Sequence, residues 1–364
     1  MRSSFLVFIA AAAQAAFAQP MALPPPKPDP SANSPSEAER ITPAEVDRVL
    51  SRLQLALRDY IFPETAVKVE RELAAQRGTY RSLSTRSSLA KRFTEDMRAI
   101  GGDKHLSVTF GEELGIRKSP TAAEQQHAHD FDRANAFGLR AARRLPGNIG
   151  YIDLAYFSPD PEAGMTIAAA MQLVSGTDAL IIDLRHNGGG SGETERTLAS
   201  YFLPQETQLS GIFENEGGRH RERQHWTVPY LGGARYLSKP VYILVGPHTH
   251  SAAEVFSYDL HNLKIAKIIG EHTSGDATSS TGETDLGYGL TALIPNGQLI
   301  SPITRTNYFR VGVLPDVAAS GEGSLRIAYT MALKEARSTV NSEDLLSEKS
   351  KALSDPSAAL TINE

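Results

Sequence analysis

The chain has 364 residues, with 37 lysine plus arginine against 42 aspartate plus glutamate, and no cysteine. A net charge of −5 gives no basic footprint for nucleic acid, and the lack of cysteine excludes a disulfide scaffold, an iron–sulfur site and a cysteine nucleophile. The length and a hydrophobic fraction of 41% allow a large core in one large or two medium domains.

The first 18 residues have the three parts of a secretory signal. Arg2 supplies a positive charge, residues 5–13 are apolar, and Ala-Phe-Ala at 16–18 precedes Gln19. The apolar run is shorter than the roughly 20 residues that span a bilayer. We therefore expect a cleaved signal peptide at 1–18, a periplasmic or secreted mature protein, and no membrane span.

A linker and a helical region follow the signal. Residues 19–40 are rich in proline, serine and alanine, which predicts a disordered linker. Thr42, Pro43 and Glu45 form a helix-start signature, with a capping threonine, a proline in the first turn and a capping-box glutamate. We expect an N-terminal helical region over 41–111, with helices at 42–60, 63–77 and 84–100. Residues 112–144 are polar and form a connecting segment.

From residue 145 onward strands alternate with helices, which predicts βαβ units and an α/β fold. The run 179–184 is continuously apolar, as in a buried parallel strand. We expect this α/β core over 145–335 and a flexible tail over 336–364. The expected strands are 149–157, 179–184, 241–245 and 265–269, the expected helices are 165–174, 194–202 and 252–263, and 212–228 is a candidate hairpin.

The first candidate site is the glycine run at 183–190, directly after a predicted buried strand. The carboxyl end of such a strand is where α/β folds bind ligands, and glycines let backbone N–H groups approach a negative atom. The alternative is a flexible turn. Neither the dinucleotide-binding spacing nor the P-loop lysine is present.

The second candidate is Ser251, between a predicted strand and a predicted helix. A serine there can simply cap the helix, or it can be a nucleophile at a strand-to-helix turn. In the second case the N–H of Ala252 would face a developing oxyanion, and Gly189 or Gly190 would bring a second donor.

A serine nucleophile needs a base, and His105 is the candidate, unless it is an exposed turn residue. His250 is a poor partner for Ser251, because neighbouring side chains on an extended segment point to opposite sides. His248 and His250 could instead begin a metal site. Further ligands would come from Glu254, Glu271 or His272, while His186 is expected to be a solvated loop residue.

Taken in chain order, these motifs resemble the tail-specific, or C-terminal-processing, serine protease clan. The branch similar to interphotoreceptor retinoid-binding protein and the tricorn core matches best, over about residues 42–317. The motifs are Tyr-Ile-Phe-Pro-Glu at 60–64, Asp-Lys-His-Leu at 103–106, Leu-Pro-Gly-Asn-Ile-Gly-Tyr-Ile at 145–152, the glycine run at 183–190, Ser-Ala-Ala-Glu at 251–254, Gly-Glu-His-Thr-Ser-Gly at 270–275 and Gly-Val-Leu-Pro-Asp at 312–316.

The resemblance implies a crotonase-like (ClpP/crotonase) α/β core with an N-terminal helical region. It also implies a serine peptidase in which Ser251 is the nucleophile, His105 is the base, and the backbone of Gly189 and Ala252 forms the oxyanion hole. It implies no cofactor and no metal, and its substrate is a peptide or an unfolded protein.

Three positions depart from the pattern of the clan. Asp276 stands where Ser–Lys members carry lysine, and residues 111–145 are too short for the PDZ domain that many members have. Phe309 stands where tricorn-like members carry the glutamate that supports the histidine. Glu283 or Asp285 could take that role.

Three functions stay open at this point. The first is a secreted serine peptidase that uses Ser251 and His105. The second is a degenerate member of the fold that carries a hydrophobic small molecule, which the Phe309 departure favours. The third is a metal hydrolase built on His248 and His250. No pattern in the sequence indicates an oligomeric state.

Overall fold

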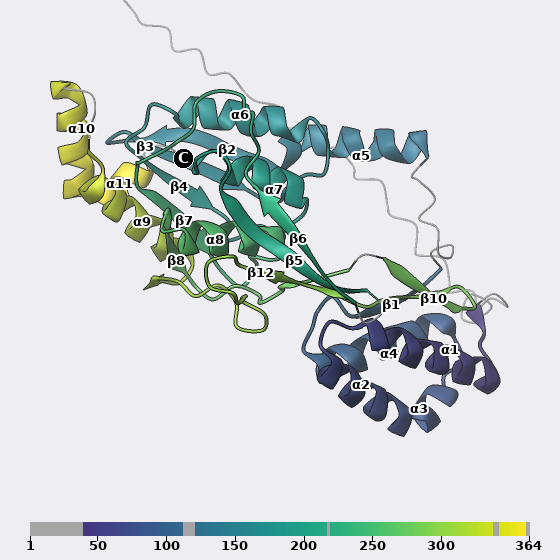
Figure 1. The fold of residues 1–364 in the computed structure, drawn as a ribbon. Coiled ribbons are helices and arrows are strands. Elements are labelled where there is room, and N and C mark those ends of the chain that lie inside the picture. Colours follow the sequence, from purple (N-terminus) through teal and green to yellow (C-terminus); the bar gives the residue numbers. More distant parts are fainter. Residues whose placement is uncertain (1–38, 112–120, 217–218, 281, 338–341, 362–364) are drawn as a thin grey trace, which may run out of the picture. The chain divides into compact units, whose positions relative to one another are not determined.

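The computed structural model of the chain describes residues 39–111, 121–216, 219–280, 282–337 and 342–361 (Figure 1). The predicted signal peptide and all but the end of the predicted linker lie outside these residues. The described residues form one compact unit. Among the described residues no helix combines the length and the apolar character needed to cross a membrane.

The predicted N-terminal helical region is a small helical bundle. Thr42 caps the first helix, and Glu45 closes the capping box as predicted. Gly102 ends the last helix in a left-handed conformation, with φ 66°. The helices are α1 (Pro43–Ala56), the short 3-10 turn η3 (Leu57–Asp59), α2 (Pro63–Ala75), α3 (Arg77–Arg81) and α4 (Arg86–Gly101).

A hairpin from much later in the chain completes the core of this bundle. Strands β10 (Glu283–Gly287) and β11 (Leu290–Leu293) pair with each other, and β11 also pairs with β1 (Ser107–Phe110). Buried residues of the hairpin, including Leu286 and Leu290, pack in one cluster with Leu53 and Phe93 of the helices. Figure 1 shows β1 and β10 beside α1 and α4.

A six-stranded sheet forms the centre of the α/β core, in the order β13-β8-β7-β4-β3-β2. All neighbours are parallel except β2 and β3. The strands are β2 (Leu139–Leu145), β3 (Ile149–Leu154), β4 (Ala179–Asp183), β7 (Val241–Val245), β8 (Ala266–Gly270) and β13 (Val317–Ala318). Strand β2 lies in the segment that was expected to be a connection. The same segment also contains the exposed helix α5 (Ala122–Ala134) and the turn η4 (Ala136–Gly138).

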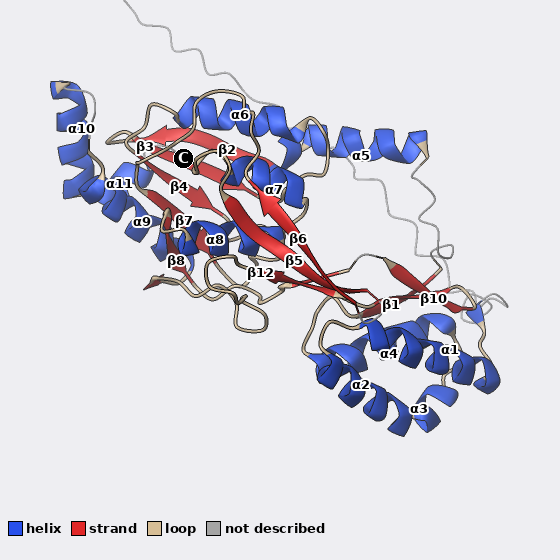
Figure 2. Cartoon of the chain, viewed as in Figure 1, coloured by secondary structure: helices blue, strands red, loops and turns tan. Residues whose placement is uncertain are grey.

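Helices cover both faces of this sheet, which confirms an α/β architecture. On one face Ile182 and Ile243 pack against α6 (Ala163–Val174), α7 (Gly192–Ala199) and α8 (Ala252–Asn262). On the other face Ile181 and Leu244 pack against α9 (Gly321–Glu335). Figure 2 shows these helices in blue around the red strands.

The prediction of a flexible tail over 336–364 is wrong for its described part. Two helices, α10 (Glu343–Ser354) and α11 (Pro356–Thr361), follow α9. Ala352 and Ala359 are buried in the cluster that contains Leu333 of α9. The small apolar residues of the tail are widely spaced among many serines and charged residues, so their pattern does not predict this packing.

The predicted hairpin is longer than expected and belongs to a four-stranded sheet. Strands β5 (Gln208–Glu216) and β6 (Arg219–Trp226) pair in antiparallel fashion. Strand β12 (Gly297–Ile300) joins β5 to the short strand β9 (Thr278–Ser279). This sheet carries Thr278 to the site described next.

Candidate active site

The loops after β4, β7 and β8 meet at one edge of the six-stranded sheet. These strands are parallel neighbours, so their carboxyl ends lie at the same edge, where α/β folds bind ligands. Residues 184–191 follow β4, residues 246–251 follow β7 and residues 271–277 follow β8. The topology thereby brings the glycine run, Ser251 and the segment around Asp276 together.

Ser251 occupies a strained turn between β7 and α8. Its backbone has φ 49° and ψ −118°, which a residue other than glycine rarely adopts and which often marks a functional turn. The helix begins at Ala252, so Ser251 is its N-cap residue. The side chain is half-buried and lines a cavity of about 240 Å³. The serine therefore sits where a strand-to-helix turn can present a nucleophile to a ligand.

Glu254 holds this turn from the first turn of α8. Its buried carboxylate accepts the N–H of Ser251 at 3.0 Å, the hydroxyl of Thr273 at 2.5 Å and the N–H groups of Gly275 at 2.6 Å and Asp276 at 3.0 Å. Burial raises the pKa of Glu254 above its ordinary value, although these hydrogen bonds act in the opposite direction. Glu254 thus ties the Ser251 turn to the loop after β8.

The glycine run reaches Ser251 through the backbone of Gly189. Gly189 has φ 93°, and a Cβ built there would lie 2.8 Å from the carbonyl oxygen of His250 and 2.8 Å from the Cβ of Ser251. Only glycine permits so close an approach in this conformation. Gly189 and Ser251, 62 positions apart in the chain, are therefore in direct contact.

Asn187 determines which amides of the run are available. Its Nδ2 donates to the carbonyl oxygen of Leu154 at 2.9 Å, and its Oδ1 accepts the N–H of Gly189 at 2.8 Å. The amide that the resemblance assigned to the oxyanion hole is thus already hydrogen-bonded. Among the described residues, the N–H groups of Gly190 and Ala252 have no acceptor, and both residues line the cavity beside Ser251.

His105 is oriented by a relay of side chains. Its Nδ1 lies 2.8 Å from Oγ1 of Thr278, and the Thr278 hydroxyl donates to Oδ1 of Asp103 at 3.0 Å. Because that hydroxyl gives its one hydrogen to Asp103, it must accept the hydrogen on Nδ1. The neutral ring therefore has a free lone pair on Nε2, which is the form that a general base needs.

Asp103 is the acid beside His105. It is 1% exposed, its Oδ1 lies 3.5 Å from Nδ1 of His105, and its Oδ2 accepts the hydroxyl of Tyr60 at 3.0 Å. The interaction with Asp103 raises the pKa of His105 above its ordinary value, and the opposing effect of burial is smaller. Asp103 was not predicted as a partner of His105, although it stands two residues before His105 in the motif at 103–106.

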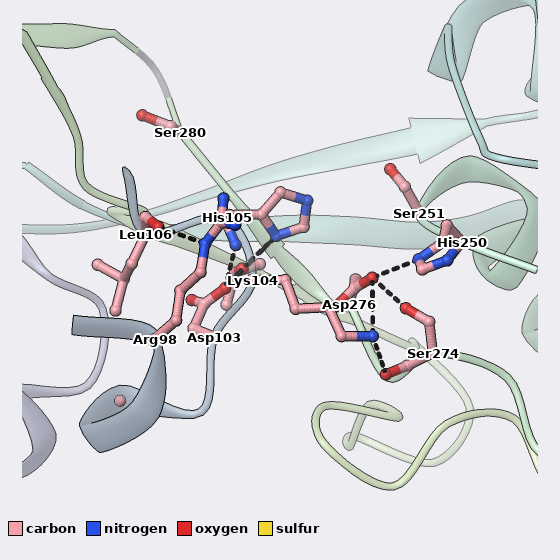
Figure 3. Close-up of polar contacts among 12 residues, drawn as sticks. Arg98, Asp103, Lys104, His105, Leu106, His250, Ser251, Ser274, Asp276 and Ser280 are labelled. Carbon is pink, nitrogen blue, oxygen red and sulfur yellow. Dashed lines mark hydrogen bonds and ion pairs between the residues drawn. The ribbon is translucent and has the colours of Figure 1, made fainter. Parts of the chain in front are cut away.

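The segment that carries His105 contacts the lining of the cavity beside Ser251. Thr278 lines that cavity, and Lys104 Nζ donates to the carbonyl oxygen of Ser274 at 3.3 Å. Figure 3 shows the ring of His105 between Asp103 and Ser251, with its second nitrogen on the side of Ser251. Among the described residues no hydrogen bond joins the side chains of His105 and Ser251.

The other candidates for a supporting acid lie elsewhere. Glu283 and Asp285 are exposed on β10. Among the described residues neither forms a hydrogen bond or an ion pair with His105. Both residues follow Thr278 closely in the sequence, but they lie on the hairpin that packs against the helical bundle. Their position on that hairpin keeps them away from His105.

Phe309, at the position of the expected glutamate, has a packing role. Its ring stacks on Phe62 with centroids 4.6 Å apart, and Phe62 packs edge-on against Tyr60 at 5.5 Å. Tyr60 is the residue that donates to Asp103. Phe309 thus supports the surroundings of the acid from a distance.

A second histidine–aspartate pair lies next to Ser251. Nδ1 of His250 is 2.8 Å from Oδ2 of Asp276, which also accepts the hydroxyl of Ser274 and lies 3.9 Å from Nζ of Lys104. Burial acts to raise the pKa of Asp276, but the hydrogen bonds from Ser274 and His250 outweigh it and hold the pKa below its ordinary value. Asp276 is therefore an ionised partner of His250.

The histidines considered as metal ligands do not converge with the acidic residues named beside them. The ring of His248 stacks on that of His186, with centroids 6.4 Å apart, while His250 faces Asp276. Across the described ranges, no group of three or more histidine, aspartate or glutamate residues is arranged to hold a metal ion. The metal-hydrolase hypothesis therefore has no ligand set in this part of the chain.

Two family models match the chain. Residues 148–319 match peptidase family S41, and residues 41–133 match the N-terminal domain of Peptidase_S41 in eukaryotic IRBP. The first match contains Ser251 and the glycine run, and the second contains His105 and Asp103. The helical region and the α/β core thus each match a family model, and each contributes part of the candidate site.

Curated proteins with similar sequences are processing proteases. The chain is 30% identical over 134 residues to the carboxy-terminal processing protease CtpA of Bacillus subtilis, covering 37% of this chain and 27% of that protein. It is 26% identical over 173 residues to a carboxyl-terminal-processing protease of Synechocystis, covering 47% and 38%. The chain thus spans well under half the length of these relatives.

Solved structures share the fold at low identity. A candidate peptidase from Parabacteroides merdae has a TM-score of 0.56 at 17% identity, covering 83% of this chain and all of that one. A lipoprotein from Streptococcus agalactiae has a TM-score of 0.52 at 16% identity, covering 80% and 96%. At these identities the comparison supports the architecture alone.

Proposed function

The chain carries a peptidase family S41 domain over residues 148–319, and from this premise we propose that it is a serine peptidase with Ser251 as nucleophile and His105 as base. The observation that carries the proposal is the arrangement around one cavity. Ser251 sits on a strained turn against Gly189, and Thr278 of the same cavity orients His105. A capping role alone would require neither the close glycine nor the oriented histidine.

The chemistry follows from these positions. Ser251 Oγ attacks the carbonyl carbon of the scissile peptide bond while Nε2 of His105 takes the hydroxyl proton. The tetrahedral intermediate collapses, and His105 gives that proton to the departing amine. Water then attacks the ester on Ser251, with His105 again as base, and the freed acid leaves with Ser251 restored.

We assign the oxyanion hole to the N–H groups of Ala252 and Gly190. The resemblance pointed to Gly189, but the N–H of Gly189 is donated to Asn187. In this assignment Gly189 positions the run by its close approach to Ser251, and the next amide faces the substrate oxygen. Each oxyanion donor contributes about 3–4 kcal/mol in the transition state.

We assign the supporting acid to Asp103, acting through Thr278 as well as directly. Asp103 is buried 3.5 Å from Nδ1 of His105, whereas Glu283 is exposed on β10. A buried carboxylate at this distance stabilises the imidazolium that forms during attack. The N-terminal domain would thereby supply both the base and its acid.

The finer features of the proposal come from the sequence. The core is crotonase-like, the signal at 1–18 directs the protein to the periplasm or outside the cell, and the substrates are peptides or unfolded segments. A carrier of hydrophobic molecules is the alternative function. The cavity argues against this alternative. The buried carboxyl of Glu195 lines it, and an apolar ligand would offer that carboxyl no hydrogen-bond donor.

Peptide hydrolysis by matched serine variants tests the proposal. Ser251→Ala should reduce turnover of a mixed peptide library at least about 10⁴-fold. Ser175→Ala, at a partly exposed serine after α6, should leave turnover within about twofold of the unchanged protein. Equal turnover by the two variants would exclude this mechanism. Copurified lipid together with an inert Ser251 would favour the carrier.

A further inference from the structure

The cavity beside Ser251 has a lining that the proposed mechanism does not explain. Its volume is about 240 Å³, and Ile212, Val255 and Leu299 supply apolar surface. The lining also includes two buried polar side chains, Glu195 and Tyr308. Because Ser251 attacks the carbonyl of the P1 residue, the side chain of that residue must lie close by. The cavity is therefore placed to receive it.

Glu195 reaches the cavity from α7, the helix that starts directly after the glycine run. It is 2% exposed, and its Oε1 accepts no hydrogen bond from any residue that the structure describes. Burial raises the pKa of Glu195 well above its ordinary value, and Asp259 acts in the same direction. A buried oxygen without a donor is costly, which points to a donor that arrives with a ligand.

Tyr308 presents a second unpaired polar group, a hydroxyl that can accept as well as donate a hydrogen bond. It is 2% exposed, and within the described ranges its hydroxyl has no hydrogen-bond partner. Burial is the main reason that the pKa of Tyr308 lies well above its ordinary value, and the carboxyls of Glu254, Asp259 and Glu195 add to it. The phenol therefore stays neutral in acidic surroundings.

The cations near Glu195 do not satisfy it. Arg196 is adjacent on α7, but neighbouring residues of a helix face different directions, and no ion pair joins it to Glu195 among the described residues. Arg223 on β6 is paired with Glu214. His225 also lines the cavity, and its pKa is lowered by burial and by Arg196 and Arg223, so it adds no charge at neutral pH.

We propose that this cavity is the S1 subsite, which holds the P1 side chain of the substrate. It accepts a lysine or arginine side chain, which donates to Glu195 and Tyr308. The inference rests on the proposed function, because P1 is defined by attack from Ser251. Ammonium and guanidinium groups only donate hydrogen bonds, so two acceptors without donors suit them. The surrounding carboxyls favour a cation and disfavour an acidic side chain. A leucine side chain would fit the apolar wall but leave both acceptors unpaired.

A series of peptides that differ only at P1 tests the subsite. The value of kcat/KM for lysine or arginine at P1 should exceed that for leucine by about 100-fold, and glutamate should be the poorest. Glu195→Gln should reduce the ratio of lysine to leucine at least about tenfold, while hydrolysis of the leucine peptide stays within about threefold. Glu193→Gln, at an exposed glutamate on the same helix, is the matched control and should keep the ratio.

Binding of p-aminobenzamidine gives a readout that needs no catalysis. This fluorescent amidinium should bind the Ser251→Ala variant, and adding Glu195→Gln should weaken binding at least about tenfold. Thermal unfolding checks that Glu195→Gln still folds, which is expected because an uncharged side chain replaces an unpaired buried acid.

The outcomes separate the two proposals. A chain that hydrolyses peptides through Ser251 without preferring lysine or arginine at P1 overturns the subsite alone. A lysine-to-leucine ratio or amidinium affinity that Glu195→Gln leaves unchanged also overturns it. A chain that hydrolyses no peptide, but binds the amidinium through Glu195, refutes the peptidase proposal while supporting a cation site in this cavity.

Discussion

Replacing Asp103 with asparagine should impair catalysis and shift its pH dependence. Oδ1 of Asp103 lies 3.5 Å from Nδ1 of His105. At an effective dielectric constant of about 20, a charge pair at that distance interacts by about 5 kcal/mol, whereas a charge-assisted hydrogen bond measured by mutation contributes about 1.5–3 kcal/mol. With tenfold in rate per about 1.4 kcal/mol, the range from about 1.5 to about 5 kcal/mol predicts a fall in kcat of between about 10-fold and about 3 × 10³-fold.

The direction of the pH shift follows from the pKa of His105. Asp103 raises this pKa above the reference value of 6.5, and burial lowers it. Because the base must be neutral, the acidic limb of kcat/KM in the unchanged protein should lie above about pH 6.5. Without the charge of Asp103, the lowering effect of burial is opposed only by the smaller effects of Asp276 and Glu254, so the limb should move to lower pH in Asp103→Asn.

Steady-state hydrolysis between pH 5 and 9 measures both effects in one experiment. Asp59→Asn, at an exposed aspartate in the same bundle, is the control and should change neither kcat nor the limb. An unchanged kcat in Asp103→Asn, or a limb that moves to higher pH, would refute the role given to this acid.

Four further substitutions test other parts of the account. Thr278→Val removes the hydroxyl that accepts from His105 and should lower kcat about tenfold with KM nearly unchanged, as read from steady-state kinetics. Gly189→Ala places a Cβ 2.8 Å from the carbonyl oxygen of His250. It should lower the free energy of unfolding by about 1–3 kcal/mol and reduce kcat/KM at least about 100-fold. Activity near that of the unchanged protein would contradict the contact with Ser251. Glu254→Gln disturbs a buried four-fold acceptor and should lower stability by about 2–3 kcal/mol in urea unfolding. Ala352→Asp, at a 2% exposed position of α10, should destabilise the chain by at least about 2 kcal/mol if the tail packs as described, whereas a flexible tail would tolerate it.

The fold of the core could be predicted from the sequence because its signals are local. The continuous apolar run at 179–184 marks a strand buried on both faces, and the cap at Thr42 marks a helix start; the structure has both. The ordered tail could not be predicted in this way. Its helices are held by a few buried alanines against α9, and alanine in a polar sequence gives no periodic signal.

The site was only partly predictable for a related reason. Ser251 and the glycine run follow predicted strands, so parallel topology suffices to bring them together. The relay of Asp103, Thr278 and His105 depends on β9 in the four-stranded sheet meeting a loop of the helical bundle. No spacing in the sequence specifies that meeting. The direction of individual amides, such as the N–H of Gly189 toward Asn187, is likewise a result of tertiary structure.

The central claim is that a hydroxyl, an imidazole and backbone amides act on one substrate carbon, and covalent labelling tests it most directly. A fluorophosphonate should add once per chain, and peptide mapping by mass spectrometry should place the adduct on Ser251. His105→Ala should slow the labelling at least about 100-fold. An adduct on another residue, or a labelling rate at Ser251 that is unchanged in His105→Ala, would contradict the account.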